Sequence, residues 1–295
     1  MMGVLNHLFT LLLLSLLPPA LSHVVVKFSD VPQCQKFFLE GTTPNLPGIL
    51  VGGIVQNQNR YKPICQLYKN ISRFATLYDT TNKIPVFSAY TFTGNISGRP
   101  SQSWMIEPQL NCHTPVNTDY KNNPSLDRGH LFPCSHAPDN DTKKSTFTLT
   151  NAVPQNHNFN QVSWRIMEGK VREALVNNCN DNNNRIKAYV VTGAVPSKNN
   201  TLNNRVNIPD LLWTAFCCYN NNMKNWTVGA YWGGNRNSSG SILNLKTLGK
   251  LEAKLKQSYN GTVKVFHDNC PRNVQVQQVN TRTTEEMESE CDENL

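Results

Sequence analysis

Nine cysteines constrain the fold of this 295-residue chain more than any other feature of its sequence. All of them lie beyond residue 30, and this number is typical of proteins that form disulfides in an oxidising compartment. Two are adjacent, Cys217 and Cys218, and neighbouring residues of a β-strand point to opposite faces. One of the pair can therefore face the core while the other reaches a partner elsewhere. Nine is odd, so at least one thiol is free or intermolecular, and we expect it to be Cys291 in the polar C-terminal segment.

The first 22 residues contain the only long apolar run, Leu8 to Leu17. This run is too short for a membrane helix, which takes roughly 20 apolar residues. Small residues at positions 20 and 22 precede His23, as they do at a signal-peptide cleavage site. We therefore predict a signal peptide over residues 1–22 and a secreted, extracellular protein without a membrane span.

Seven acceptor sequons for N-linked glycans support secretion independently. The chain has 39 asparagines, which raises the chance frequency of such sequons, so we expect several of them, and not all, to carry sugar. The predicted glycosylation sites are Asn70, Asn95, Asn140, Asn199, Asn225, Asn237 and Asn260.

The charge of the chain is unevenly distributed. The formal net charge is +8, but the segment from Thr281 onward holds six acidic residues against one arginine. Residues 1–280 therefore carry a net charge of +13. A body this basic attracts polyanions such as nucleic acid or glycosaminoglycan, without specifying which.

Patterns of strand and helix predict the architecture. Two β-branched and aromatic stretches, Arg73 to Asp79 and Ile84 to Thr93, predict a hairpin. Apolar residues at helical spacing predict the main helix over residues 158–178. Runs of strands with helices inserted favour an α+β fold with a mainly antiparallel central sheet over an alternating βαβ fold. Further strands are predicted over residues 145–150, 186–194, 211–219, 226–232 and 262–267, and a second helix over residues 245–259.

The chain is predicted to consist of four parts. The signal peptide over residues 1–22 is followed by an irregular leader over residues 23–59, interrupted by prolines and Gly52-Gly53, which we expect to pack on the body. The body forms one domain over residues 60–270. A polar acidic tail spans residues 271–295.

Two motifs carry the chemistry. The first is Asp127-Arg128-Gly129-His130, and the second runs from Asn151 through Pro154-Gln155 to Asn160-Gln161 and Trp164, leading into the helix that carries Glu168. The order His, strand, Pro-Gln turn, Asn, helix, Glu is much more specific than either part alone. It resembles the DNA/RNA non-specific endonuclease family. The segments around residues 64–66, 73–79 and 84–86 resemble vertebrate members, and the resemblance covers roughly residues 25–270.

This resemblance implies a ββα-metal (His-Me finger) unit within the α+β fold. One arm of the unit carries Asp-Arg-Gly-His, and Asn160 opens the helix, so His130 and Asn160 are the implied pair of site residues. The family also uses an upstream arginine near the phosphate, for which Arg99 is the local candidate, although its spacing to Trp104 departs from the pattern. Arg99 is therefore assigned to substrate binding.

The residue types fit phosphodiester hydrolysis. A neutral imidazole is abundant at neutral pH, so His130 can act as the general base that activates water. The amide oxygen of Asn160 suits a hard, mostly hydrated cation such as Mg²⁺ or Mn²⁺, which polarises the phosphate and the leaving 3′ oxygen. In a strand, the side chains of Arg128 and His130 lie on the same face, so Arg128 would lie beside the phosphate. The side chain of Asp127 lies on the other face, where we expect it to accept structural hydrogen bonds. Glu168, about 12 Å further along the helix, can reach back to orient a metal-bound water.

These features predict a secreted, metal-dependent nuclease that hydrolyses DNA and, as an open alternative, RNA. A rival interpretation keeps the fold but makes the protein a catalytically silent polyanion-binding or nucleic-acid-binding protein. A disulfide-linked or non-covalent dimer, with Cys291 as the linking residue, also stays open. Four other histidines belong to no motif, so surface or structural roles are favoured for them: His113, His136, His157 and His267. The Asn-rich segment over residues 180–184 is interpreted as a solvated turn rather than a calcium loop.

Overall fold

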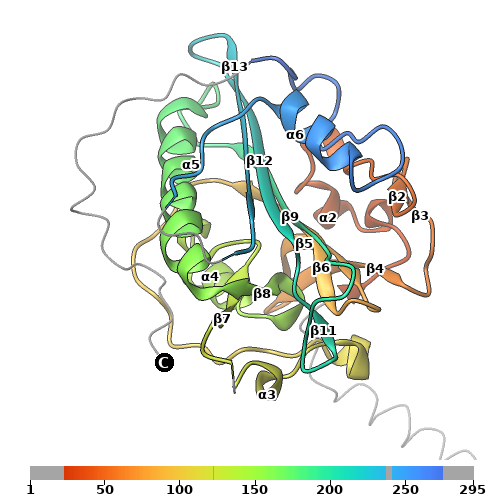
Figure 1. The fold of residues 1–295 in the computed structure, drawn as a ribbon. Coiled ribbons are helices and arrows are strands. Elements are labelled where there is room, and N and C mark those ends of the chain that lie inside the picture. Colours follow the sequence, from red (N-terminus) through yellow and green to blue (C-terminus); the bar gives the residue numbers. More distant parts are fainter. Residues whose placement is uncertain (1–22, 122, 237–240, 275–295) are drawn as a thin grey trace, which may run out of the picture.

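The computed structural model describes residues 23–121, 123–236 and 241–274. Its centre is a seven-stranded sheet with the strand order β1-β4-β5-β6-β9-β12-β13 (Figure 1). Every neighbouring pair in this sheet is antiparallel, so the α+β fold with a mainly antiparallel sheet is confirmed. The strands are β1 (His23–Val24), β4 (Tyr61–Tyr68), β5 (Ile71–Asp79), β6 (Ile84–Phe92), β9 (Ala188–Val195), β12 (Leu211–Asn220) and β13 (Asn225–Gly234).

The two faces of the sheet are both covered, and the central strands are buried along nearly their whole length. In β6, Phe87 and Ala89 pack into the core on one face, and Tyr90 and Phe92 pack into the core on the other. This alternation follows from the pleat of a strand, which sends successive side chains to opposite faces. The sequence of β6 is therefore apolar at almost every position.

One face of the sheet carries the main helix α5 (Arg165–Asn178) and a separate hairpin. The hairpin consists of β7 (Leu126–His130) and β8 (Ala152–Asn156), which pair with each other and not with the central sheet. Helix α5, green in Figure 1, lies on this side of the sheet, and α6 (Leu248–Lys256), in blue, lies on the other. Met167, Val171 and Leu175 form the buried stripe of α5, which confirms the predicted amphipathic helix.

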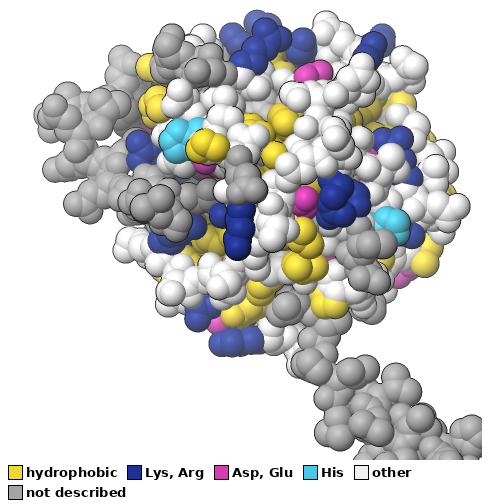
Figure 2. Space-filling view, turned by 60° about the horizontal axis from the view of Figure 1, so that its bottom comes forward, with side chains coloured by type: hydrophobic (Ala, Val, Ile, Leu, Met, Phe, Trp, Pro, Cys, Tyr) yellow, Lys and Arg dark blue, Asp and Glu magenta, His cyan; other side chains and the backbone are white. Residues whose placement is uncertain are grey.

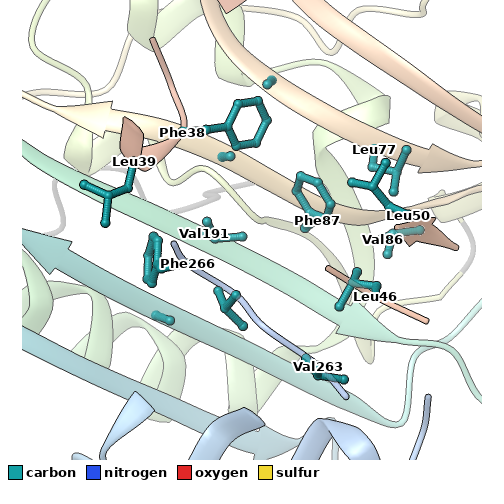
Figure 3. Packing of buried hydrophobic residues seen from close by; sticks show 14 of the residues in the cluster. Phe38, Leu39, Leu46, Leu50, Leu77, Val86, Phe87, Val191, Val263 and Phe266 are labelled. Atoms are coloured by element: carbon teal, nitrogen blue, oxygen red, sulfur yellow. The ribbon is translucent and has the colours of Figure 1, made fainter. Parts of the chain in front are cut away.

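The opposite face is covered by the two ends of the described chain. Figure 3 shows Phe38, Leu39 and Leu46 from the N-terminal segment beside Val263 and Phe266 from the C-terminal segment, all packed on sheet residues. The N-terminal segment is mostly irregular between short elements. These elements are η1 (Phe28–Asp30), α2 (Pro32–Gln35), η2 (Leu39–Gly41), β2 (Leu50–Val51) and β3 (Ile54–Val55).

The adjacent cysteines of β12 face opposite layers. Cys217 lies in the core shared with the chain ends and pairs with Cys270, whereas Cys218 lies in the core under α5 and pairs with Cys179. A third disulfide joins Cys34 of α2 to Cys65 of β4. The predicted odd cysteine, Cys291, lies outside the described residues.

Two sequence-based predictions of elements are wrong, and one strand was not predicted. Residues 145–150 are not a strand, because Asp139 caps a helix at the Thr142 N–H and this helix, α4 (Asn140–Thr146), runs into the segment. Residues 262–267 form only an isolated bridge between Asn45 and Lys264. The strand β4 was not predicted, because Pro63 argues against a strand interior. The remaining short elements are η3 (Pro108–His113), α3 (Asn117–Tyr120), η4 (Cys134–His136), η5 (Leu149–Asn151), η6 (Phe159–Trp164), β10 (Thr201–Leu202) and β11 (Val206–Asn207).

Several predictions concern the surface and the chain ends. The proposed signal peptide and the residues of the acidic tail from position 275 onward lie outside the described residues. Within the part of the chain that is described, no helix is both long and apolar enough to span a bilayer. Of the predicted glycosylation sites, Asn95 is half-buried and Asn237 is outside the described residues. The exposed ones are Asn70, Asn140, Asn199, Asn225 and Asn260.

Candidate functional site

The hairpin of β7 and β8 places the Asp-Arg-Gly-His motif. Arg128 is paired with Pro154 and His130 with Ala152 in antiparallel register. Arg128 and His130 both contact Trp104, whereas Asp127 contacts residues of the helix start on the other side. The predicted division of the motif between the two faces of the strand is therefore confirmed.

Gly129 is required by the packing of Gln155 across the hairpin. A Cβ atom at position 129 would lie 1.9 Å from Oε1 and 2.7 Å from Cβ of Gln155. Gln155 is fully buried, so it has no free space into which it can move. A side chain at position 129 would therefore displace the strand that carries His130.

Asn151 fixes the chain that leaves His130. Its Oδ1 accepts hydrogen bonds from the Phe132 N–H at 3.0 Å and from the Ser88 hydroxyl at 2.8 Å. Its Nδ2 donates to the carbonyl oxygens of Phe132 and Thr146, both at 3.0 Å. Asn151 is completely buried, and these four bonds use the full hydrogen-bonding capacity of its amide. The segment after the motif is thereby held to β6.

The imidazole of His130 contacts two aromatic rings that also contact each other. Its centroid is 4.8 Å from that of Trp104, in a tilted arrangement, and 4.8 Å from that of Phe147, in an edge arrangement. Two guanidinium groups lie over these rings, Arg128 at 5.5 Å from the Trp104 centroid and Arg99 at 4.9 Å from the Phe147 centroid. Such contacts are favourable because the ring face is electron-rich. Arg99, Arg128 and His130 are thus brought together.

His130 is held in its neutral form. Burial, followed by the charges of Arg99 and Arg128, lowers the pKa of His130 to about 3. Its Nε2 is buried and has no hydrogen-bond partner among the described residues. At neutral pH His130 is therefore in the neutral form, which is the form of imidazole that can accept a proton.

Asp127 binds the start of the helix from the other face of the hairpin. Its carboxylate accepts hydrogen bonds from Asn160 Nδ2 at 2.9 Å and from Gln161 Nε2 at 3.1 Å. His157 Nδ1 lies 3.0 Å from Asp127 Oδ1. Because Nδ2 of Asn160 is used in this way, its Oδ1 is the atom that remains to bind a ligand.

Asn160 lies in a π-helical turn, η6, and not in the regular α-helix that the spacing predicts. The Arg165 N–H reaches the carbonyl oxygen of Asn160, five residues back. Turns of this kind are rare and occur frequently at functional sites. The turn continues directly into α5, so the predicted helix over residues 158–178 is confirmed apart from its first turns.

Glu168 lies half-buried on α5, near a buried histidine. His136 Nε2 donates to the carbonyl oxygen of Glu168 at 2.9 Å, and the Tyr90 hydroxyl lies 2.8 Å from Nδ1 of the same ring. Burial lowers the pKa of His136 to about 4. His136 is therefore a structural residue, and its contacts anchor α5 to β6.

The predicted site residues form two neighbouring groups. Arg99, Arg128 and His130 surround the aromatic rings, and Asn160 is held by Asp127. No hydrogen bond or ring contact joins His130 to Asn160 in the described part of the chain. Sequence reasoning missed Trp104 and Phe147 as neighbours of His130, because no residue type or spacing marks either one as part of the site.

The donor atoms of the site fit a hydrated cation. Across residues 23–121, 123–236 and 241–274 no group of three or more His, Cys, Asp and Glu side chains is arranged to hold a metal ion. One neutral amide oxygen, from Asn160, suits Mg²⁺ or Mn²⁺, which keep most of their water, and does not suit zinc. The turn at Asp181 is a solvated turn, since its carboxylate accepts hydrogen bonds from the N–H groups of Asn183 and Arg185.

The surface charge agrees with an anionic partner. Figure 2 turns the bottom of Figure 1 toward the reader, and dark blue Lys and Arg side chains are more prominent on this face than magenta Asp and Glu side chains. Residues 1–280 carry the net charge of +13. A surface of this kind attracts nucleic acid at long range.

The fold contains a unit of the ββα-metal type: β7 and β8 form the hairpin, and η6 with α5 supplies the helix. The sequence matches the family model of DNA/RNA non-specific endonucleases over residues 52–294, and the chain belongs to this family.

Among proteins of known sequence, the chain is similar to the endonuclease domain-containing 1 protein of Homo sapiens, with 31% identity over 209 residues. This match covers 63% of the chain and 39% of the human protein, and the Mus musculus protein matches at 30% identity over 63% of the chain and 38% of its own length. The chain thus matches about two fifths of the length of these relatives.

Among solved structures, the chain resembles a chain of the crystal structure of the EndoG/EndoGI complex, which concerns the mechanism of EndoG inhibition. The TM-score is 0.52 with 19% sequence identity, over 65% of this chain and 82% of the other. At this identity the likeness supports the fold alone.

Proposed function

We propose that this protein is a secreted, metal-dependent endonuclease that hydrolyses phosphodiester bonds of DNA and also of RNA. The observation that carries the proposal is the convergence of Arg99 and Arg128 on a neutral His130. Two guanidinium groups beside a general base are what hydrolysis of an anionic phosphodiester requires. Contacts of this kind go to the phosphate and carry no base information, so sequence preference should be weak.

Each residue has a distinct role in the proposed reaction. His130 accepts the proton of the attacking water. Arg128 and Arg99 bind the phosphate oxygens, on which negative charge increases in the transition state. Asn160 would hold Mg²⁺ or Mn²⁺ through Oδ1, and Glu168 would orient water near this position. When bound, the cation supplies Lewis-acid stabilisation of the phosphate and the leaving oxygen.

The cellular setting belongs to the same proposal. A signal peptide over residues 1–22, glycans on several of the exposed sequons and at least three disulfides agree with an extracellular enzyme. The body over residues 60–270 would form the endonuclease domain, with the leader over residues 23–59 packed on it and the acidic tail over residues 271–295 outside it. Dimerisation through Cys291 is tested by electrophoresis with and without reductant.

A second candidate function has one observation in its favour. Nε2 of His130 is buried, so this nitrogen does not meet solvent in the present conformation, although the residue as a whole is half-buried. A protein in which the site stays closed would bind nucleic acid without cutting it.

One experiment separates the two functions. Purified secreted protein is incubated with supercoiled plasmid and with single-stranded RNA, in Mg²⁺ or in EDTA, beside His130→Ala. Metal-dependent cutting that is lost in His130→Ala supports the nuclease. Gel retardation of DNA without cutting, under several metals and salts, would leave the binding protein as the function.

A further inference from the structure

The orientation of His130 is not fixed by hydrogen bonds. Neither ring nitrogen of His130 has a hydrogen-bond partner among the described residues. His136 shows the usual arrangement, with both ring nitrogens bonded, to Tyr90 and to the carbonyl oxygen of Glu168. A hydrogen bond to the second nitrogen commonly fixes the tautomer and orientation of a catalytic imidazole. Something else must therefore hold the ring of His130.

The two rings that contact His130 come from main-chain segments that are joined by hydrogen bonds. The Met105 N–H, next to Trp104, donates to the carbonyl oxygen of Phe147 at 2.8 Å, and the Leu149 N–H donates back to the Met105 carbonyl oxygen at 2.9 Å. These two bonds fix the main chains of both aromatic residues side by side. The centroids of Trp104 and Phe147 are 5.4 Å apart, and Phe147 is completely buried. The imidazole thus contacts two rings whose main chains are held side by side.

We propose that Trp104 and Phe147 are positioning residues that hold the His130 imidazole in its reactive orientation. The proposal rests on the proposed nuclease function. The guanidinium groups of Arg128 and Arg99 lie over the same two rings, so one aromatic unit contacts the proposed base and both proposed phosphate-binding groups. In this proposal, the contacts with the two rings orient the His130 imidazole in place of a hydrogen bond to one of its ring nitrogens.

The kinetic test uses Trp104, which is half-buried and can be changed with less risk to the fold than buried Phe147. Trp104→Leu keeps an apolar side chain and removes the flat ring, whereas Trp104→Phe keeps a ring. We expect kcat for plasmid cleavage in Mg²⁺ to fall by about 10- to 100-fold in Trp104→Leu, because small displacements of reacting groups cost this much. KM should change little, and Trp104→Phe should restore most of kcat.

The matched control removes a comparable ring contact far from the site. Tyr219 packs edge-to-face on Trp226 at 5.3 Å, and Trp226 borders the core on the opposite face of the sheet. Tyr219→Leu should leave kcat and KM at the wild-type values. Melting temperatures of all variants are measured in parallel, and Trp104→Met replaces Trp104→Leu if the latter does not fold.

A spectroscopic readout tests the geometry without relying on activity. The carbon-bound ring protons of His130 lie in the ring currents of two aromatic neighbours, so their NMR signals should be displaced from ordinary histidine positions. His130→Ala identifies these signals by their loss. In Trp104→Leu they should move toward ordinary positions and broaden, and in Trp104→Phe and Tyr219→Leu they should stay near those of the wild type.

The outcomes separate the two proposals. Unmoved His130 signals in Trp104→Leu, or a folded Trp104→Leu variant with kcat within about twofold of the wild type, would overturn the positioning role. An inactive wild type would overturn the nuclease function on which the kinetic part rests, and the NMR comparison would then decide alone whether the rings hold the imidazole.

Discussion

The carboxylate of Asp127 accepts a hydrogen bond from the side-chain amide of Asn160 at 2.9 Å. This bond ties the strand that carries His130 to the helical turn that carries Asn160. Because this bond uses the side-chain amide nitrogen of Asn160, the side-chain amide oxygen is the atom that remains available as a ligand. The two halves of the candidate site are therefore coupled through a residue that has no direct chemical role.

Asp127→Asn should weaken metal binding more than turnover. The substitution puts an amide where three donors, from Asn160, Gln161 and His157, now converge on a carboxylate. We expect the Mg²⁺ concentration for half-maximal cleavage to rise by about 10-fold or more, a typical effect of losing a partner of a metal ligand. Magnesium titrations of plasmid cleavage measure it. His157→Ala removes only an exposed donor and serves as control; equal titration curves for Asp127→Asn and wild type would contradict the prediction.

Arg99→Gln should shift the acid limb of the pH–rate profile to higher pH. Burial makes the largest contribution to the low pKa of His130, and the charge of Arg99 makes the next. Removing a neighbouring positive charge makes protonation of His130 easier, so its pKa rises and the base is lost at a higher pH as the solution is acidified. Because the wild-type pKa of His130 is about 3, profiles of kcat/KM between pH 2.5 and 6 measure the shift. Arg185→Gln, an exposed arginine paired with Asp181, is the control, and a limb that stays in place or moves to lower pH would contradict the assignment.

Asn151→Ala should destabilise the fold strongly. The change leaves the N–H and carbonyl oxygen of Phe132, the Thr146 carbonyl oxygen and the Ser88 hydroxyl without their shared buried partner. We expect a loss of about 3–5 kcal/mol in the free energy of unfolding, since each buried unsatisfied group costs about 1–3 kcal/mol and local relaxation recovers part. Urea unfolding at neutral pH measures this loss, and the exposed Asn182→Ala is the matched control. A loss below about 1 kcal/mol would mean that other groups hold the segment after His130.

Stability should fall as the pH is lowered from 6.5 to 4.5. The folded-state pKa values of His130 and His136 are lowered to about 3 and about 4, so below pH 6.5 the unfolded chain takes up two protons that the folded chain does not. Glu107 acts in the opposite sense, because burial raises its folded-state pKa to about 7, and the stability it contributes is lost as the pH rises from 4.5 through 7. Two protons against one leave a net loss of stability on acidification, with each proton contributing about 1.4 kcal/mol per pH unit at most.

Glu107→Gln tests this balance. It removes the opposing group, so the free energy of unfolding should depend more steeply on pH between 4.5 and 6.5 than in the wild type. Urea unfolding at four pH values in this range gives the slope. A shallower slope in Glu107→Gln would show that the carboxyl group is ionised in the folded protein.

The central strands and the main helix could be predicted because their patterns reflect packing. Strand β6 is apolar on both faces since each face meets a core, and α5 shows one buried stripe. The segment over residues 145–150 was mistaken for a strand because its alternation comes from a helix end followed by a 3-10 turn, each with its own burial requirement. In β4, Pro63 masked a strand that tertiary pairing supports.

The candidate site was predictable only where its chemistry is concentrated in short motifs. His130, Arg128 and Asn160 stand in such motifs, and the pleat of β7 was enough to separate Asp127 from its neighbours. Trp104 and Phe147 come from distant segments, and the main-chain bond between Met105 and Phe147 brings them together. A pairing of this kind has no periodicity in the sequence, so the aromatic surroundings of His130 could be recognised only in the structure.

The disulfides of Cys217 and Cys218 close two covalent rings, over residues 179–218 and 217–270, that overlap at one peptide bond. A protease that cuts any single bond between residues 179 and 270 therefore opens a ring without releasing a fragment. The strands from β9 to β13 and helix α6 all lie within this stretch. Outside the cell, where proteases are common and reductants scarce, a nicked molecule would keep its sheet together and would separate into pieces only after reduction.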